Sequence, residues 1–141
     1  MKGRVCLITG ANTGIGKETA LALARQGAKM VLAGRSKERT QKVLDEINNH
    51  GGEKAMFIPL DLGSLDSVRE GAAAFLESGL DLDVLINNAG LAGHRGITAD
   101  DFEITFGVNH LAVDHVADSD CGGHRISRRE REDLIYRSLL K

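Results

Sequence analysis

The stretch Thr9-Gly10-Ala11-Asn12-Thr13-Gly14-Ile15-Gly16 decides the fold, because it joins a buried strand to an amphipathic helix. The run before it, Val5-Cys6-Leu7-Ile8, is nearly all apolar, as expected of a strand that is covered on both faces. Glycines at such a junction permit a tight turn and let the backbone approach a pyrophosphate, which the helix N-terminus attracts. The stretch therefore predicts a dinucleotide-binding loop, and the alternative is a turn with a structural role alone.

Buried strands and amphipathic helices alternate along the chain up to about residue 115. The further strands are expected at residues 30–33, 55–58 and 84–86, and the helices at 15–26, at 37–49, from 64 onward and from 98 to about 115. This βαβαβαβα order implies a parallel sheet. Because crossovers are right-handed, the simplest arrangement is the 3-2-1-4 half of a doubly wound, Rossmann-type α/β fold.

The pattern also predicts helix ends and helix faces. Ser36 is the expected N-cap of the second helix, and Ser64 begins the third. Thr98 with Asp101 resembles a capping box for the fourth. The residues expected to face the core are Ile15, Thr19, Ala22 and Leu23 in the first helix, Thr40, Val43, Leu44 and Ile47 in the second, and Leu65, Val68, Ala72, Phe75 and Leu76 in the third.

The end of the second strand is where a dinucleotide-binding fold selects its cofactor. An acidic residue there would hold the ribose 2′-hydroxyl of NAD(H) and repel a 2′-phosphate. The chain instead has Gly34-Arg35, and an arginine can pair with a phosphate through charge-assisted hydrogen bonds. We therefore predict NADP(H) in preference to NAD(H); the alternative is that Arg35 is a solvated loop residue.

Four motifs together resemble the short-chain dehydrogenase/reductase family. They are the spaced glycines of residues 9–16, Asp61-Leu62 after the third strand, Asn87-Asn88-Ala89-Gly90 after the fourth, and Phe106-Gly107-Val108-Asn109-His110-Leu111. The residues of these motifs, together with Gly16-Lys17-Glu18-Thr19-Ala20, look most like those of the retinol-dehydrogenase-like branch. The resemblance covers about residues 1–112, the N-terminal half of such a protein. It implies an NADP(H)-dependent oxidoreductase that interconverts alcohols and carbonyls.

The resemblance also implies roles for individual residues. The cofactor would be held by Gly10, Asn12, Thr13, Gly14, Ile15 and Gly16 of the loop, by Arg35, by Asp61 and Leu62 at the adenine, and by Asn88, Ala89 and Gly90 at the adenosine ribose. Asn87 would help to tie its loop to the sheet. Asn109 would be the asparagine of the catalytic tetrad, which bends its helix and holds a water in the proton relay. The structural alternatives are a turn residue for Asp61 and a partner of backbone groups in its own helix for Asn109.

The other members of the catalytic tetrad are not recognisable in the chain. In the family a tyrosine acts as acid or base, a lysine four residues later lowers its pKa, and a serine orients the carbonyl. The single tyrosine, Tyr136, has Leu140 at that position, and Lys141 lies on another side of the helix. Ser127 lies in a charged, arginine-rich stretch. We therefore assign only Asn109 to catalysis.

The character of the sequence changes after residue 113. Residues 114–141 are rich in charge and poor in aliphatic side chains, and no fifth strand is recognisable among them. We expect residues 1–113 to form an NADP(H)-binding half-domain that stops after the fourth strand and its helix, leaving Val84-Leu85-Ile86 as an exposed apolar edge. The tail is expected to be disordered or partly helical. A truncated, mis-spliced or frameshifted product and a natural short form are both consistent with it.

Metals, nucleic acids and membranes are not expected partners. Cys121 and the histidines near it lack the paired spacing of a zinc motif, and the charges of residues 128–133 are mixed in sign. The composition, with 42% hydrophobic and 27% charged residues and a net charge of −2, is that of an ordinary soluble protein. The two cysteines make no disulfide framework, and no signal or membrane-spanning segment is visible. A reducing, cytoplasmic location is therefore expected.

Three functions are compatible with these observations. The leading one is an NADP(H)-dependent oxidoreductase of the short-chain dehydrogenase/reductase type, represented by a chain without the catalytic Ser, Tyr and Lys. The second is a module that binds NADP(H) without catalysis, and the third is a fragment with no independent function. A nicotinamide dinucleotide and a small alcohol or carbonyl are the expected ligands. The sequence specifies neither the particular substrate nor the oligomeric state.

Overall fold

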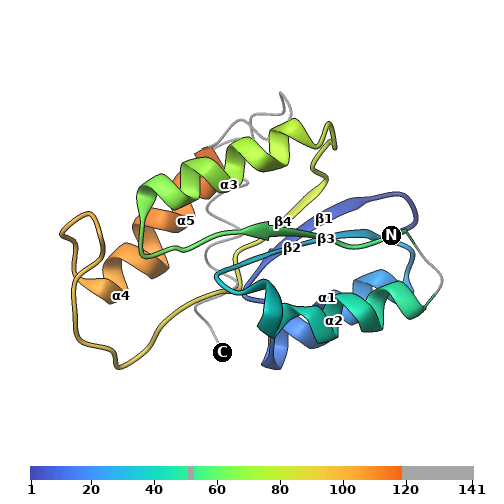
Figure 1. Ribbon diagram of the computed structural model, residues 1–141, viewed down its shortest axis with the longest axis horizontal. Helices are drawn as coiled ribbons and strands as arrows, with labels where there is room; N and C mark the ends of the chain where they lie inside the picture. The colour runs from blue at the N-terminus through green and yellow to red at the C-terminus, as the bar shows by residue number, and fades with distance from the viewer. Residues whose placement is uncertain (51–52, 119–141) are drawn as a thin grey trace.

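The structure, a computed structural model, describes residues 1–50 and 53–118 of the chain. The centre of this part is a four-stranded parallel sheet with helices on both faces (Figure 1). The strands are β1 (Val5–Thr9), β2 (Lys29–Gly34), β3 (Met56–Pro59) and β4 (Val84–Ile86). They lie in the order β3-β2-β1-β4, so the predicted strand order and the Rossmann-type fold are confirmed.

Helices cover the two faces of the sheet in pairs. On one face lie α1 (Gly14–Arg25) and α2 (Lys37–Asn49), and on the other lie α3 (Leu65–Glu77) and α5 (Ala112–Asp118) (Figure 1). A short α4 (Ile104–Phe106) and a π-helix, η1 (Gly107–Leu111), run directly into α5. Since the strands are parallel, their carboxyl ends meet at the same edge of the sheet, and the loops that follow them gather there.

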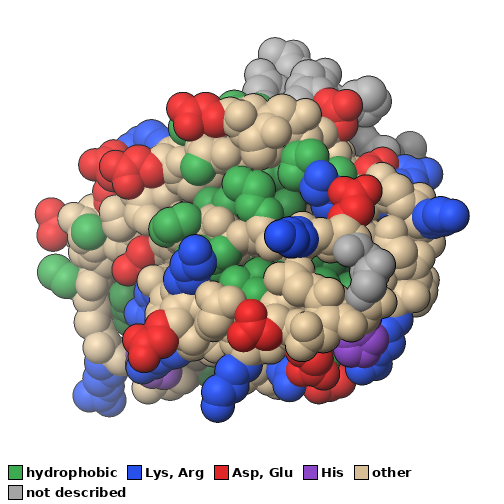
Figure 2. Space-filling model, turned by 45° about the vertical axis from the view of Figure 1, so that its right-hand side comes forward, with side chains coloured by type: hydrophobic (Ala, Val, Ile, Leu, Met, Phe, Trp, Pro, Cys, Tyr) green, Lys and Arg blue, Asp and Glu red, His purple; other side chains and the backbone are tan. Residues whose placement is uncertain are grey.

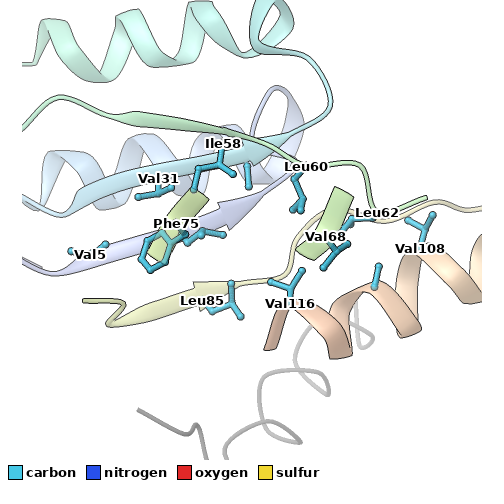
Figure 3. Close-up of a cluster of buried hydrophobic side chains, with 13 residues drawn as sticks. Val5, Val31, Ile58, Leu60, Leu62, Val68, Phe75, Leu85, Val108 and Val116 are labelled. Atoms are coloured by element: carbon cyan, nitrogen blue, oxygen red, sulfur yellow. The ribbon is translucent and has the colours of Figure 1, made fainter. Parts of the chain in front are cut away.

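Two clusters of buried side chains hold the helices to the sheet. One includes Val68 and Phe75 of α3 and lies between the sheet, α3 and the η1–α5 segment (Figure 3). The other lies under α1 and α2 and includes Cys6 and Ile8 of β1. Successive strand residues belong to alternate clusters because side chains point alternately to the two faces of a strand. Burial, and secondarily the charge of Asp83, raises the pKa of the Cys6 thiol, which packs as a neutral apolar group.

The predicted apolar face of the first helix is right for Leu23, which packs against the core, but wrong for Ile15 and Ala22. Ile15 is 78% exposed and Ala22 faces solvent, whereas Gly16, Ala20 and Leu21 are buried. The cause is the contact at the start of the helix, where Gly16 lies directly against the loop that follows β4. This side of the first turn must face the sheet, and the buried face continues at Ala20, about one helical turn further on.

The predicted faces of the next two helices are largely confirmed. The buried residues of α2 are Thr40, Val43, Leu44 and Ile47, as expected. Ser36 and Ser64 cap α2 and α3, each accepting a hydrogen bond from the backbone N–H three residues later. In α3, Val68 and Phe75 are buried, but Leu76 is 44% exposed. Gly71 is also buried, close to the end of β3, where a Cβ would come within 2.9 Å of Leu60 Cδ1 and 3.2 Å of the Pro59 carbonyl oxygen.

The predicted start of the fourth helix at Thr98 and Asp101 is wrong. The Thr98 hydroxyl oxygen does accept hydrogen bonds from two following backbone N–H groups, at 3.3 and 3.2 Å. The chain then turns away, because Asp101 adopts a φ of 63° in the left-handed region, which interrupts a helix. The helix begins at Ile104 instead, where the carboxylate of Glu103 accepts hydrogen bonds from two N–H groups of the first turn. These bonds lower the pKa of Glu103.

β4 is the outermost strand on its side of the sheet within the described residues. The prediction that its side chains form an exposed apolar edge is only partly right. Leu85 is 4% exposed, and Val84 and Ile86 are half-buried, since helices cover both faces of the sheet. The exposed part of this edge is the backbone of β4, because β4 pairs with β1 on one side only.

The surface of the molecule mixes charges of both signs. Figure 2 shows Lys and Arg interspersed with Asp and Glu over the face that it displays. None of the helices in residues 1–50 and 53–118 has the length and apolar character needed to cross a bilayer. The same part of the chain brings no three His, Cys, Asp or Glu side chains together as a metal site.

Candidate cofactor site

A pocket of about 310 Å³ lies at the carboxyl ends of the strands. Open α/β sheets bind ligands at such a position, where the order of the strands reverses on the two sides of β1. The predicted site residues that line the pocket are Gly10, Asn12, Thr13, Arg35, Asp61, Leu62, Asn88, Ala89 and Gly90. The predicted residues outside its lining are Gly14, Ile15, Gly16 and Asn109. The structure thus brings together residues from four loops that are far apart in the sequence.

Two glycines let the loop after β1 lie against the loop after β4. A Cβ on Gly10 would come within 2.9 Å of the Ala89 Cβ. A Cβ on Gly16 would overlap the side-chain amide of Asn88, which fills that space. Gly10 also has a φ of 68°, which only glycine adopts without strain. Gly16 therefore shapes the pocket from behind, without lining it.

Thr9, the last residue of β1, holds the two loops together. Its hydroxyl oxygen accepts hydrogen bonds from the N–H groups of Asn88, at 3.1 Å, and Ala89, at 3.0 Å. In return, Nδ2 of Asn88 donates to the carbonyl oxygens of Thr9, at 2.9 Å, and Gly10, at 3.2 Å. Sequence reasoning did not give Thr9 this role. The available signal was a polar residue that ends an otherwise apolar strand and is 1% exposed in the structure.

The residue that ties the loop after β4 to the sheet is therefore Asn88. Sequence reasoning gave this role to Asn87, and the structure does not show it. Oδ1 of Asn87 is buried and has no hydrogen-bond partner among the described residues. Asn88 can line the pocket and also hold the loop to the sheet, because its backbone N–H donates to Thr9 while its side chain donates to the carbonyl oxygen of Gly10.

Two arginines line the pocket near the end of β2. Arg35 follows the strand, Arg39 lies in the first turn of α2, and both are exposed residues of the pocket lining. Neither guanidinium makes an ion pair within the described residues. Asp61 is the single acidic residue among the described lining residues, and it lies on another loop. Sequence reasoning found Arg35 and missed Arg39, whose position in the first turn beside the N-cap Ser36 was the available signal.

Asp61 and Leu62 both line the pocket, and each carries a polar group without a partner in the described part of the chain. Oδ1 of Asp61 accepts a hydrogen bond from the N–H of Gly63 at 2.9 Å, so Asp61 is a turn residue as well as a lining residue. Its other carboxylate oxygen has no hydrogen-bond partner in the described part of the chain, and the backbone N–H of Leu62 has none there either. This acceptor and this donor remain available for a ligand.

Asn109 lies in the middle of the π-helix η1. The backbone hydrogen bonds of a π-helix span five residues instead of the four of an α-helix, and such turns often occur at functional sites. The Asn109 side chain donates to the carbonyl oxygen of Leu91 and accepts from its N–H, both at 2.8 Å. The predicted local distortion of the helix is thus a π-helical turn, and the side chain reaches the loop that carries Gly90 and Leu91.

The strand order, the glycine loop after β1 and the pocket at the carboxyl ends of the strands define a Rossmann-type nucleotide-binding protein. The family model described as short chain dehydrogenase matches residues 4–119. The chain therefore belongs to the short-chain dehydrogenase/reductase family, whose members are oxidoreductases that bind a nicotinamide dinucleotide.

Known relatives support the same assignment. Human dehydrogenase/reductase SDR family member 13 is 47% identical over 112 residues, which are 79% of this chain and 29% of that protein. Human retinol dehydrogenase 13 is 45% identical over 115 residues, or 77% of this chain and 34% of that protein. A metagenomic short-chain oxidoreductase in complex with NADP is 31% identical, with a TM-score of 0.74 over 84% of this chain and 55% of that one. The predicted retinol-dehydrogenase-like resemblance is confirmed, and the chain spans about a third of the length of these two curated relatives.

Several sequence predictions concern residues outside the described part of the chain. They are residues 119–141 of the charged tail, the absence of catalytic roles for Ser127, Tyr136 and Lys141, and the rejection of Cys121 as a metal ligand. They remain predictions. The first residues of the predicted tail, 114–118, lie instead in α5, where Val116 packs in the core.

Proposed function

We propose that the pocket binds NADP(H) in preference to NAD(H). The observation that carries this proposal is the pair of arginines that line the pocket, Arg35 directly after β2 and Arg39 in the first turn of α2, with no acidic lining residue between them. Guanidinium groups bind phosphate through charge-assisted, bidentate hydrogen bonds. The 2′-phosphate that distinguishes NADP(H) would lie between them. The related oxidoreductase solved with NADP is consistent with this proposal.

The pyrophosphate of the cofactor is proposed to lie against residues 10–16. Thr13 is the N-cap residue of α1, but its side chain makes no capping hydrogen bond. The first turn of α1 also contains no acidic residue that would offset the positive end of the helix dipole. The unpaired N–H groups and the dipole are therefore available to an anionic ligand.

The adenine is proposed to lie beside Asp61 and Leu62. Its Watson–Crick edge presents an amino group as donor and a ring nitrogen as acceptor. The unpaired carboxylate oxygen of Asp61 and the unpaired N–H of Leu62 complement that edge. The ribose is proposed to lie along residues 88–90, which Thr9 holds in place.

The chemistry proposed for the complete fold is the interconversion of an alcohol and a carbonyl, in which the nicotinamide gives or accepts a hydride. In this chain Asn109 is proposed to belong to the site of that reaction. The single tyrosine, Tyr136, is not followed by a lysine four residues later. We therefore infer that residues 1–113 bind the cofactor and that the 141-residue chain does not turn over a substrate alone.

A fluorescence titration of the 141-residue chain with NADPH, with NADH as the comparison, tests this proposal. Saturable binding with a lower Kd for NADPH is expected, without oxidation of NADPH by added aldehydes or ketones. Turnover would show that the catalytic groups are present after all. Failure to bind either dinucleotide, from a chain that also does not unfold cooperatively, would favour a fragment without independent function.

A further inference from the structure

Residues 98–100, here called the bridge segment, join the chain between β4 and α4 to the start of α3. The N–H of Ala99 donates to the carbonyl oxygen of Gly63 at 2.9 Å. Oδ2 of Asp100 accepts a hydrogen bond from the N–H of Leu65, the first residue of α3, at 2.8 Å. Figure 1 shows this long loop beside the end of α3 at which the helix begins. The bridge segment thus holds both residues that flank the N-cap of α3.

The other side of the bridge segment packs against η1. Thr98 is 7% exposed, and its methyl group occupies the space that a Cβ on Gly107 would need. Gly107 is the first residue of η1, followed by the pocket residue Val108 and by Asn109. The bridge segment therefore touches the loop after β3 with one side and the Asn109 helix with the other.

We propose that Asp100 is a positioning residue for the adenine end of the cofactor site, acting on Asp61 through the segment from Gly63 to Leu65. The proposal rests on the proposed function, in which the Asp61 carboxylate binds the adenine amino group. That carboxylate is oriented by the N–H of Gly63, which donates to its Oδ1. Asp100 and Ala99 fix Leu65 and Gly63 through hydrogen bonds of their own, so they contribute to where the carboxylate lies.

The effect of Asp100 is confined to the first turn of α3 and the loop before it. The body of α3 is held by the buried cluster that contains Val68, Phe75 and Val116 (Figure 3). Removing the Asp100 carboxylate leaves this cluster intact and frees the N–H of Leu65. A carboxylate also suits a helix N-terminus electrostatically, which strengthens its hold on that turn.

The test compares NADPH with its deamino analogue, in which hypoxanthine replaces adenine. Hypoxanthine presents a carbonyl oxygen and a ring N–H, so its hydrogen-bonding edge is reversed and does not match Asp61 and Leu62. We expect the 141-residue chain to bind the analogue about five- to tenfold more weakly than NADPH, the effect of one or more lost hydrogen bonds. The ratio of the two Kd values then reports the adenine contact alone.

In Asp100→Ala, NADPH binding should weaken about fivefold, which corresponds to one hydrogen bond, while binding of the deamino analogue changes little. The ratio of Kd values should therefore fall close to one. Asp100→Asn keeps an oxygen that can accept from Leu65 and should preserve the ratio. Asp101→Asn, at the adjacent exposed residue, removes the same charge without a hydrogen bond and serves as the matched control.

An Asp100→Ala variant that unfolds cooperatively and keeps the wild-type ratio would overturn the inference, and so would proportional weakening of both ligands. If Asp100→Ala does not fold, Asp100→Glu replaces it, because glutamate keeps the charge but displaces the carboxylate. This variant should also lower the ratio of Kd values, and an unchanged ratio overturns the inference equally. If the wild-type chain binds NADPH and the deamino analogue with equal Kd values, the adenine makes no contact of the expected kind, and the inference is overturned. Absence of NADPH binding by the wild-type chain would instead overturn the proposed function.

Discussion

Asn109 and Leu91 exchange two hydrogen bonds, each 2.8 Å long, between the π-helix η1 and the loop that follows β4. The side-chain amide matches the backbone amide of Leu91, donor to acceptor and acceptor to donor. Sequence reasoning offered a tetrad role for Asn109 and a role within its own helix. The structure shows a third role, in which Asn109 fixes the wall of the pocket formed by residues 88–91.

Replacing Asn109 with Asp should destabilise the fold, although the two side chains have almost the same shape. An aspartate can accept from the N–H of Leu91, but its second oxygen faces the Leu91 carbonyl and cannot donate to it. We expect a loss of about 1–2 kcal/mol in the free energy of unfolding, measured by urea denaturation at pH 7. Asn49→Asp makes the same change at an exposed residue of α2 whose side chain has no hydrogen bond in the described part of the chain, and it is the control. An equal effect of the two changes would mean that the pair with Leu91 adds nothing.

Replacing Arg39 with Ala should weaken NADPH binding about 10- to 100-fold, the range expected for one charged hydrogen-bonding group, with little effect on NADH. Arg35→Asp should go further and shift the preference toward NADH, because it places an acid where the 2′-phosphate would lie. Both Kd values are measured by the fluorescence of the reduced nicotinamide. Lys42→Ala, a change on an exposed face of α2 outside the pocket lining, is the control for a general loss of positive charge. Unchanged preference in Arg35→Asp would contradict the assignment of the phosphate position.

Replacing Thr9 with Val should cost about 2 kcal/mol of stability, because the part-buried N–H of Ala89 loses its acceptor and that of Asn88 keeps only the carbonyl oxygen of Ile86, while the size of the side chain is kept. Thr9→Ser keeps the hydroxyl and removes only a buried methyl group, so about 1 kcal/mol is expected. Urea denaturation of both variants checks the order. If Thr9→Ser were the less stable variant, packing rather than hydrogen bonding would be the main contribution of Thr9.

The stability of the amino-terminal end of the sheet should depend on pH through Asp83. Its Oδ2 accepts the N–H of Val5 at 2.8 Å and its Oδ1 pairs with Arg4 at 2.9 Å. The Val5 hydrogen bond first, and then Arg4, lower the pKa of Asp83 below its ordinary value of 3.8. A lowered pKa in the folded state means that the contribution is complete above the ordinary value and disappears as the pH falls below it.

Asp83→Asn should therefore be less stable than the wild type at pH 7, and the difference should shrink as the pH falls below about 4. Unfolding free energies measured at several pH values between pH 7 and pH 3 check this. Asp81→Asn, which removes an exposed carboxylate two residues earlier, is the matched control. A difference that stays constant over this range would show that the charge of Asp83 is not responsible.

The strands and their order could be predicted from the sequence because buried strands of a parallel sheet are short apolar runs. Helix faces were less predictable. The periodicity around Ile15 is compatible with several rotations of the helix, and the contact of Gly16 with a distant loop selects one of them. The predicted start of the fourth helix was wrong for a similar reason. Thr98 does cap a turn, but the left-handed backbone of Asp101 turns the chain away before a helix can follow.

The binding residues in the four loops could be predicted because their motifs are contiguous in the sequence. The hydrogen bonds that organise them could not, since Thr9 meets Asn88 and Asn109 meets Leu91 only in the folded chain. The choice between Asn87 and Asn88 depends on which side chain points toward β1. Arg39 joins Arg35 only because α2 begins directly beside the pocket.

The hydrogen bonds between Thr9 and residues 88 and 89 have a consequence for how the molecule acquires its binding site. The loop after β1 is made early in synthesis, but its partners follow 79 and 80 residues later. Contacts of such long sequence separation form late, because the intervening chain must first be ordered. A growing chain that ends before residue 89 has the glycine loop without its support. The ability to retain a dinucleotide should therefore arise abruptly as the chain lengthens past β4, and a series of ribosome-stalled chains would report that step.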